Sequence, residues 1–304
     1  MADGSVVRGI AGSATRFYYR YVEPPLFAMR KDRRLRLLGV RDVADLPVAV
    51  LDMEENRPEC VASCRVQIDS ERRHLDKFLF RPDHNASAFS RWRGVPQVLD
   101  LDAFPDFQSY VDKVAGRDAK RRDKARDIKK ARALGYYVKP IGRATHYEEM
   151  IEIQSSKLFR TGGLVIAALP GVQRAMSSAR YWDWNECALH WGSVWGAFTP
   201  ERKDQGNTCE RLAAYCHMRR VGNRIHGIAL MGHAAHLRNG VVKLLFFEVM
   251  RWLLDRQDPR VIGVRYFQGG AIEQGRESSL AWKRRFQFQP YVYAWSNATP
   301  ATAG

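Results

Sequence analysis

The densest group of chemically active side chains lies between Arg117 and Arg132. Nine of these 16 residues are Lys or Arg and three are Asp. Gly135 follows where a helix is expected to end, and the stretch 136–138 has the residue types of a strand. The pattern predicts a basic helix that either presents a solvated face or binds the phosphates of a polyanion. For the second role it offers Arg121, Arg122, Lys124, Arg126, Lys129 and Lys130.

The chain as a whole is also strongly basic. The 304 residues carry a formal net charge of +16, and the isoelectric point is near 9.9. A surplus of this size favours a polyanionic partner such as a nucleic acid, or an anionic cofactor or surface. The alternative is a generally arginine-rich composition without a functional meaning. The hydrophobic content of 45% is that of a globular protein with a real core.

Cysteine and histidine are the residues that could bind a metal or act as nucleophiles. The five cysteines are irregularly spaced and form no CxxC pair, so the sequence predicts reduced thiols of a cytoplasmic protein and no structural zinc site. His233 and His236 stand three residues apart, which suits two ligands on one helical face. Because no third ligand follows at a convincing distance, we expect no metal and assign them to a substrate pocket instead.

Neither a secretory leader nor a membrane span is expected. The first 17 residues lack a sustained apolar segment. The longest apolar stretch, near 241–254, is interrupted by Lys243, Glu248 and Arg251. The sequence therefore predicts a cytoplasmic protein without a membrane span.

Residues 1–142 are interpreted as a strand-rich N-terminal domain that ends in the basic helix. Short apolar runs between turn residues predict strands, and a helix near 107–114 precedes the basic one. The expected strands are 35–40, 47–51, 61–68, 75–80 and 98–101.

Residues 143–304 are interpreted as the catalytic domain. Thr145 and Glu148 have the spacing of a capping box that opens a helix ending near Phe159, and a second helix is expected over 170–181. Three strands should follow at 193–198, 211–218 and 225–232. A helix over 240–255, a strand over 261–267 and a final strand over 290–295 complete the order.

Two motifs in this order resemble the acyltransferase fold called GNAT, and in particular its branch of Fem-type peptidyltransferases. The first is the basic helix from Lys124 to Ala131 with the glycine that follows it. The second is Gly269-Gly270, then a short loop, then the run 280–286 and Pro290. The resemblance spans about residues 98–295. It implies an α+β fold with a mixed central sheet flanked by helices, and a degenerate GNAT-like domain in front of it.

The resemblance also implies an active site. Lys283 matches the family lysine beside the reacting carbonyl, where a cation stabilises the oxyanion of the transition state. The alternative is a surface lysine in a basic run. Trp282 either walls the pocket or packs in the core, and Arg284 and Arg285 are assigned to binding of the donor RNA. The acyl donor is expected beside the third strand, at His233, His236, Arg238, Asn239 and Gly240.

The loop before the long helix indicates which acyl donor the protein uses. Users of acetyl-coenzyme A in this fold have a loop whose small residues let backbone amides hold a pyrophosphate at the helix N-terminus. Here Val242 stands at one of these small positions. Its side chain would crowd a pyrophosphate, so the positive charge favours an aminoacyl-tRNA instead.

These observations lead to an acyltransferase that forms an amide bond. It is expected to move an aminoacyl group from a charged tRNA to an amine of a peptide-like or small-molecule acceptor, with no cofactor. Two alternatives stay open. One is an N-acyltransferase that uses a thioester of coenzyme A or of an acyl carrier protein, and the other is a non-catalytic nucleic-acid-binding protein on the same fold.

Overall fold

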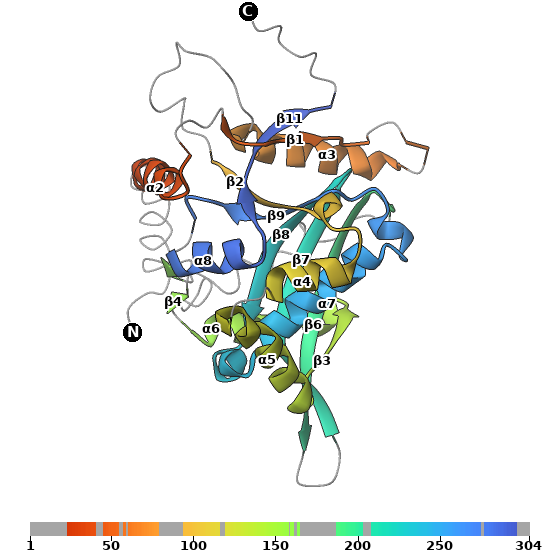
Figure 1. The fold of residues 1–304 in the computed structure, drawn as a ribbon. Coiled ribbons are helices and arrows are strands. Elements are labelled where there is room, and N and C mark those ends of the chain that lie inside the picture. Colours follow the sequence, from red (N-terminus) through yellow and green to blue (C-terminus); the bar gives the residue numbers. More distant parts are fainter. Residues whose placement is uncertain are drawn as a thin grey trace, which may run out of the picture.

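A mixed seven-stranded sheet forms the centre of the molecule (Figure 1). The computed structural model describes residues 23–40, 45–54, 57–58, 60–78, 94–115, 119–157, 159–160, 163–164, 187–202, 208–274 and 277–296. The strand order is β10-β2-β9-β8-β7-β6-β3. These strands are β2 (Pro96–Asp100), β3 (Tyr137–Ile141), β6 (His190–Arg202), β7 (Thr208–Val221), β8 (Arg224–Gly232), β9 (Tyr266–Ala271) and β10 (Gln289–Pro290).

Strand direction in this sheet alternates at every described pair but one. β8 and β9 are parallel, whereas the other neighbours are antiparallel. β7 lies near the middle and is buried from Leu212 to Met218, because helices cover both faces of the sheet. Residues on both sides of position 142 build the sheet, since β2 and β3 precede it and the other strands follow.

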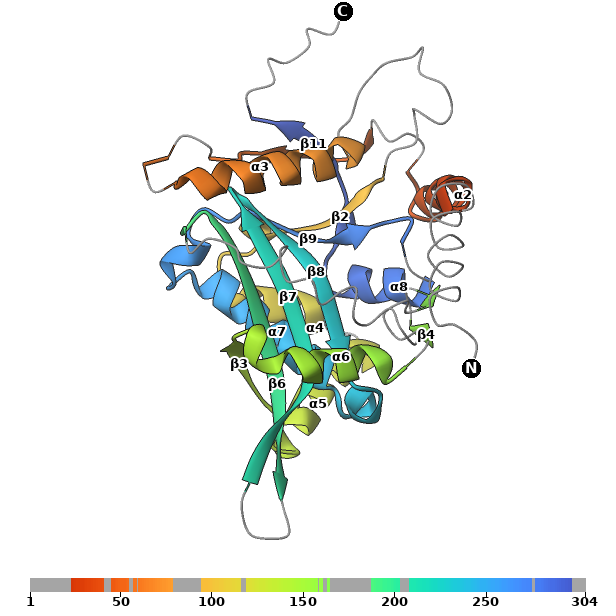
Figure 2. The same cartoon turned by 180° about the vertical axis from the view of Figure 1, so that it is seen from behind.

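Helices pack on both faces (Figures 1 and 2). α7 (Val241–Asp255) packs on one face, and α4 (Phe107–Ala115) and α5 (Ala119–Ala133) lie against it. Nine of the fifteen residues of α7 are buried, which is typical of a central helix. α6 (Tyr147–Ser155) covers the opposite face, where Met150 and Ile153 meet apolar side chains of β6 and β7.

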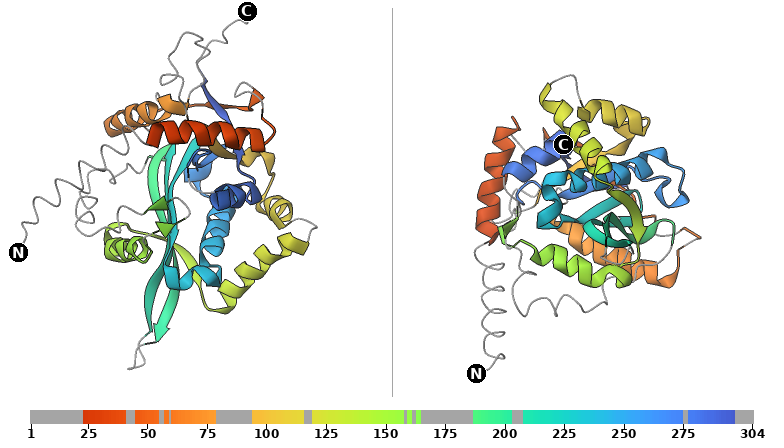
Figure 3. Two further views of the ribbon diagram at one scale, coloured as in Figure 1. Left: turned by 90° about the vertical axis from the view of Figure 1, so that its left-hand side faces the viewer. Right: turned by 90° about the horizontal axis from the view of Figure 1, so that it is seen from below.

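The remaining elements lie at one end and along one side of the sheet. β1 (Val48–Leu51) pairs in parallel with β11 (Val292–Trp295) beside α3 (Ala62–Leu75). The left panel of Figure 3 shows α2 (Glu23–Leu37) crossing above α8 (Glu277–Arg285). Two short strands, β4 (Phe159–Arg160) and β5 (Gly163–Leu164), pair with each other. Short 3-10 helices are η3 (Asp76–Phe78), η4 (Leu101–Ala103), η5 (Ala144–His146), η9 (Ala234–Asn239) and η10 (Pro259–Val261).

The α+β class and the GNAT-like order of elements are confirmed. Three antiparallel strands β6, β7 and β8 are followed by α7, and the next strand, β9, then lies parallel to β8. The basic helix and the helix near 107–114 are present as α5 and α4. No helix in the described part of the chain is long and apolar enough to cross a membrane.

The strands predicted at 35–40, 61–68 and 75–80 are wrong. The first is the end of α2, and the second lies in α3, which also ends within the third. Cys64, Ile68, Glu71 and Leu75 are the buried positions of α3 and follow the helical period, whereas Val66, which suggested a strand, is 69% exposed.

Two further predictions need correction. The capping box does not form, because α6 starts at Tyr147 after His146 and the Thr145 hydroxyl donates to the carbonyl of Gly142. This helix ends at Ser155 rather than near Phe159. β9 starts at Tyr266, because the buried Val261 belongs to η10. The helix expected over 170–181 lies outside the described residues.

Candidate active site

The parallel strands β8 and β9 part from each other after three residue pairs. Their pairing joins Arg224 to Tyr266 and ends at His226 with Gln268. β8 continues to Gly232, and its residues 226–231 are all partly exposed. Parting strands expose backbone groups that a substrate can pair with, as in other cases of recognition at a strand edge. The end of β9 therefore faces a region where a substrate can approach β8.

Lys283 lies at this end of β9. It belongs to the last turn of α8, and its Nζ is 3.5 Å from the carbonyl oxygen of Ala271. Gly270 has a φ of 85°, and a Cβ built on it would lie 3.5 Å from the same Nζ and 2.8 Å from Oε1 of Gln274. The positive φ and the close side chain of Gln274 favour glycine at this position, and a Cβ there would only touch the ammonium.

The surroundings of Lys283 change its acidity. Burial lowers its pKa from 10.5 to about 8; Glu273 opposes this shift, and Arg34 adds to it. Since this pKa is still above 7, the side chain is mostly an ammonium at neutral pH. A cation in a poorly solvated place interacts more strongly with a developing negative charge than one in water.

Glu273 is the carboxylate that faces this lysine. It is 2% exposed, and burial raises its pKa. Its Oε2 accepts a hydrogen bond of 3.2 Å from the amide of Val95. Arg34 of α2 fixes the same turn, because its Nη1 donates to the carbonyls of Ile272 at 2.5 Å and of Gln274 at 3.2 Å. Two elements distant in sequence thus hold the turn between β9 and α8.

Trp282 packs in the aromatic core beside Lys283. Its ring centroid lies 4.4 Å from that of Phe286 and 5.2 Å from that of Phe246 in α7. The indole is partly buried. These contacts fix α8 on α7 and thereby set the position of Lys283. A direct part of Trp282 in the chemistry stays a prediction.

The predicted donor pocket is the segment that connects β8 to α7. His233 accepts a hydrogen bond from the Ala235 amide at the start of η9. His236 Nδ1 lies 2.6 Å from the hydroxyl of Tyr136, to which Asn239 donates at 3.0 Å. The structure thus brings His236 and Asn239 together on one tyrosine just before β3.

The first turn of α7 lies against α5. A Cβ on Gly240 (φ 80°) would lie 2.4 Å from the carbonyl oxygen of Asp127, and the Asp127 carboxylate forms an ion pair with Lys243. Val242 fills the space on the other side, since its Cγ2 would be 2.6 Å from a Cβ on Gly232. A carboxylate at a helix N-terminus competes with a bound anion for the same favourable position.

The predicted RNA-binding residues lie on two separate elements. Arg126, Lys129 and Lys130 of α5 are exposed, and Lys130 also donates to the carbonyl of Arg238 at 3.1 Å. Arg284 and Arg285 are exposed on the last turn of α8. Arg121, Arg122 and Lys124 belong to α5, and their side chains lie outside the described part of the structure.

From the sequence, Glu273 is one of several possible proton acceptors and Arg34 is one of the basic residues that could line an RNA path, whereas Asp127 is not singled out. Glu273 was one acidic residue among several without a distinguishing motif. Arg34 lies in a basic run whose other members are mostly exposed. Asp127 interrupts a basic helix, and a single acidic residue facing a neighbouring helix is the signal that could have drawn attention to it.

No protein-family model matches the chain, and no curated protein sequence matches it. Among solved structures, the chain is similar to the C-terminal domain of a candidate lysylphosphatidylglycerol synthetase from Agrobacterium fabrum (13% identity, TM-score 0.37, covering 66% of this chain and 58% of that chain). It is also similar to FemX (8% identity, TM-score 0.44, covering 76% and 66%) and to a tandem GNAT protein from the clavulanic acid biosynthesis pathway (17% identity, TM-score 0.40, covering 81% and 73%). The chain spans somewhat more than half the length of the first of these structures.

Proposed function

We propose that this protein transfers an aminoacyl group from aminoacyl-tRNA to an amine of a peptide-like or small-molecule acceptor. The observation that carries the proposal is the position of Lys283. Its ammonium lies 3.5 Å from a carbonyl oxygen at the end of β9, where β8 and β9 have parted. A cation at such a place can stabilise the negative charge that develops on the carbonyl oxygen in the transition state of acyl transfer.

The reaction is a replacement of an ester by an amide. The neutral amine attacks the ester carbonyl carbon, a C–N bond forms, and the C–O bond to the ribose breaks. The proton of the amine ends on the ribose hydroxyl of the released tRNA. In this scheme Lys283 stabilises the oxyanion between the two steps, and Glu273 acts through Lys283, because its negative charge opposes the loss of the lysine proton.

The choice of donor rests on the start of α7 and on charge. Asp127 and Val242 crowd the helix N-terminus at which a coenzyme A pyrophosphate would bind. Exposed basic side chains such as Arg126 and Lys129 lie on α5, which contacts η9 at the end of β8. With a net charge of +16, a donor that carries many phosphates fits this surface better than a compact thioester.

The test is a donor comparison with the purified full-length chain. Aminoacyl-tRNA, acetyl-coenzyme A and an acyl carrier protein thioester are each offered with a panel of amines, and amide products are identified by mass spectrometry. The proposal predicts acceptor-dependent product with aminoacyl-tRNA and its loss in Lys283→Met. Product from thioesters alone would establish the alternative donor, and tRNA binding without product across the panel would favour a non-catalytic binding protein.

A further inference from the structure

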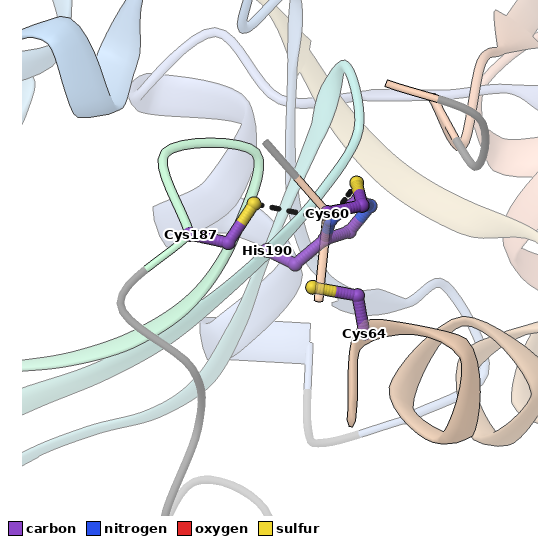
Figure 4. Close-up of side chains that lie close together, drawn as sticks. All are labelled: Cys60, Cys64, Cys187 and His190. Atoms are coloured by element: carbon purple, nitrogen blue, oxygen red, sulfur yellow. Dashed lines mark hydrogen bonds between the residues drawn. The ribbon is translucent and has the colours of Figure 1, made fainter. Parts of the chain in front are cut away.

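Three thiols and one imidazole meet at the end of the molecule near α3, away from the turn that holds Lys283. Cys60 lies two residues before α3 and Cys64 lies in its first turn, while Cys187 and His190 belong to the turn that starts β6. The metal-ligating atoms of all four lie within 4.8 Å of one another. Figure 4 shows the four side chains converging from these two segments.

Two separations between sulfur and nitrogen match those of a tetrahedral zinc site. With Zn–S near 2.3 Å and Zn–N near 2.0–2.1 Å, tetrahedral geometry places a sulfur about 3.6 Å from a nitrogen. Nδ1 of His190 lies 3.4 Å from the sulfur of Cys60 and 3.6 Å from that of Cys187. A single ion between these atoms would need little movement of the side chains.

The imidazole of His190 has the hydrogen-bond arrangement that is usual for a metal-ligating histidine. His190 is fully buried, and its Nε2 lies 2.8 Å from the carbonyl oxygen of Met53. A carbonyl can only accept, so Nε2 carries the hydrogen and the lone pair of Nδ1 faces the thiols. Donation of the second ring N–H to a backbone carbonyl is the outer contact that orients ligating histidines in zinc sites.

A buried cation beside the cluster suits its charge. Three thiolates around Zn²⁺ leave one net negative charge. Arg220 is fully buried, and its Nη1 donates at 3.0 Å to the carbonyl of Ala188, which lies between Cys187 and His190. The carboxylate of Glu54 lies 3.9 Å from the same guanidinium. An anionic metal centre would provide a further counter-charge for this arginine.

We propose that Cys60, Cys64, Cys187 and His190 bind one zinc ion as a structural site. All four tetrahedral positions are filled by protein side chains, which is typical of structural rather than catalytic zinc. The ion would join the start of α3 to the start of β6, two segments far apart in the sequence. The spacing argument missed the site because each segment contributes only two ligands, and one of these is a histidine.

A second cluster of possible ligands has a different explanation. Glu71, His74 and His226 also bring their polar atoms within 4.8 Å of one another. The carboxylate of Glu71 already forms ion pairs with Arg224 and Arg219. Two guanidinium groups at this distance neutralise the carboxylate and repel a metal ion. The test must therefore distinguish sulfur ligands from oxygen and nitrogen ligands.

The experiment measures metal content and ligand type on the full chain purified with added zinc. Mass spectrometry of the metal should find about one zinc ion per chain, as a single closed site requires. After replacement by Co²⁺, the spectrum should show tetrahedral ligand-field bands and thiolate-to-cobalt charge transfer. Cys60→Ala and Cys187→Ala should each lose most of the zinc, while Cys216→Ala, which removes a buried thiol outside the cluster, should keep it.

Any of the following results would overturn the proposal. A folded wild-type chain without zinc and without a tetrahedral cobalt spectrum would do so, as would zinc retained in both cysteine variants. A disulfide between two of the three thiols, detected by alkylation and mass spectrometry of the freshly purified protein, would replace the metal site by a redox pair. If a variant fails to fold, the charge-transfer bands of the wild-type protein alone decide whether thiolates bind the metal.

Discussion

Replacement of Lys283 by Met tests whether its ammonium takes part in catalysis or is only a surface charge. Methionine keeps most of the length of the side chain and deletes its charge. Burial lowers the pKa of Lys283 from 10.5 to about 8, which corresponds to about 3 kcal/mol that disfavours the ammonium in the resting protein. An oxyanion in the transition state is a partner that can offset such a cost.

The expected loss of turnover is of the same size. Removal of one oxyanion stabiliser costs about 10²–10³ in rate, or roughly 3–4 kcal/mol. Donor affinity should change little, because the carbonyl oxygen carries little charge before the reaction. Single-turnover aminoacyl transfer at saturating donor measures this step directly. Arg284→Met, an exposed neighbour on the same turn, is the matched control and should keep a near-normal rate.

The pH dependence provides an independent readout. The ammonium is charged below its pKa, so the ratio of wild-type to Lys283→Met turnover, in which titration of the acceptor amine cancels, should be highest below about pH 8 and fall as the pH rises through that value. Glu273 raises this pKa, so Glu273→Gln should move the fall to lower pH. Lys283→Arg should be slow, since a planar fork does not replace a compact charge, but its residual turnover should lack the fall. A folded Lys283→Met protein with near-normal turnover would refute the role of this lysine.

Three other predictions concern binding and stability. Arg126→Glu with Lys129→Glu should weaken tRNA binding and reduce the slope of log affinity against log salt by about 2, and an unchanged slope would exclude these side chains from the phosphate contacts. Calorimetry should find acetyl-coenzyme A weaker than about 100 µM, or roughly −5.5 kcal/mol, with tighter binding in Val242→Gly; a low-micromolar wild-type constant would count against the tRNA donor. Burial alone would raise the pKa of Glu71, but its arginine and histidine neighbours lower it to about 2, so its stabilisation is present above pH 4.5 and is lost as the pH falls toward 2. In urea denaturation, Glu71→Gln should lower the free energy of unfolding by about 3–5 kcal/mol, whereas the exposed Glu277→Gln should change it by less than about 0.5 kcal/mol. Similar losses in the two variants would contradict the assignment of Glu71 to a buried ion pair.

The parts of the fold that the sequence predicted well are long segments with clear periodicity. α7 has a wide apolar face, and the centre of β7 is a mostly apolar run, so both could be recognised without tertiary information. α3 could not, because its inner face includes the charged Glu71 and its outer face includes the apolar Val66. The buried carboxylate makes sense only once Arg224 is brought to it by β8.

The candidate site also has one part that the sequence shows and another part that depends on tertiary contacts. The motif around Lys283 is local and could be read from the sequence, but its pKa depends on tertiary contacts: burial lowers it most, Glu273 raises it, and Arg34 of a distant helix lowers it further. The proposed zinc ligands are another case, since Cys64 and Cys187 become neighbours through the packing of α3 against the start of β6. Contacts between distant segments are what a periodicity argument does not contain.

The buried network around Arg224 explains why β8 and β9 are joined at one end and separate at the other. The guanidinium of Arg224 donates to the side chains of Gln268 in β9 and Glu71 in α3, at the end where the strands pair. A buried charge held by two partners resists separation of the strands there. At the other end, Gly269 lies against the ring of Phe288, and Gly270 adopts a positive φ beside Lys283. The strands are therefore held together at their starts, and their separation beside Lys283 is part of the fold itself.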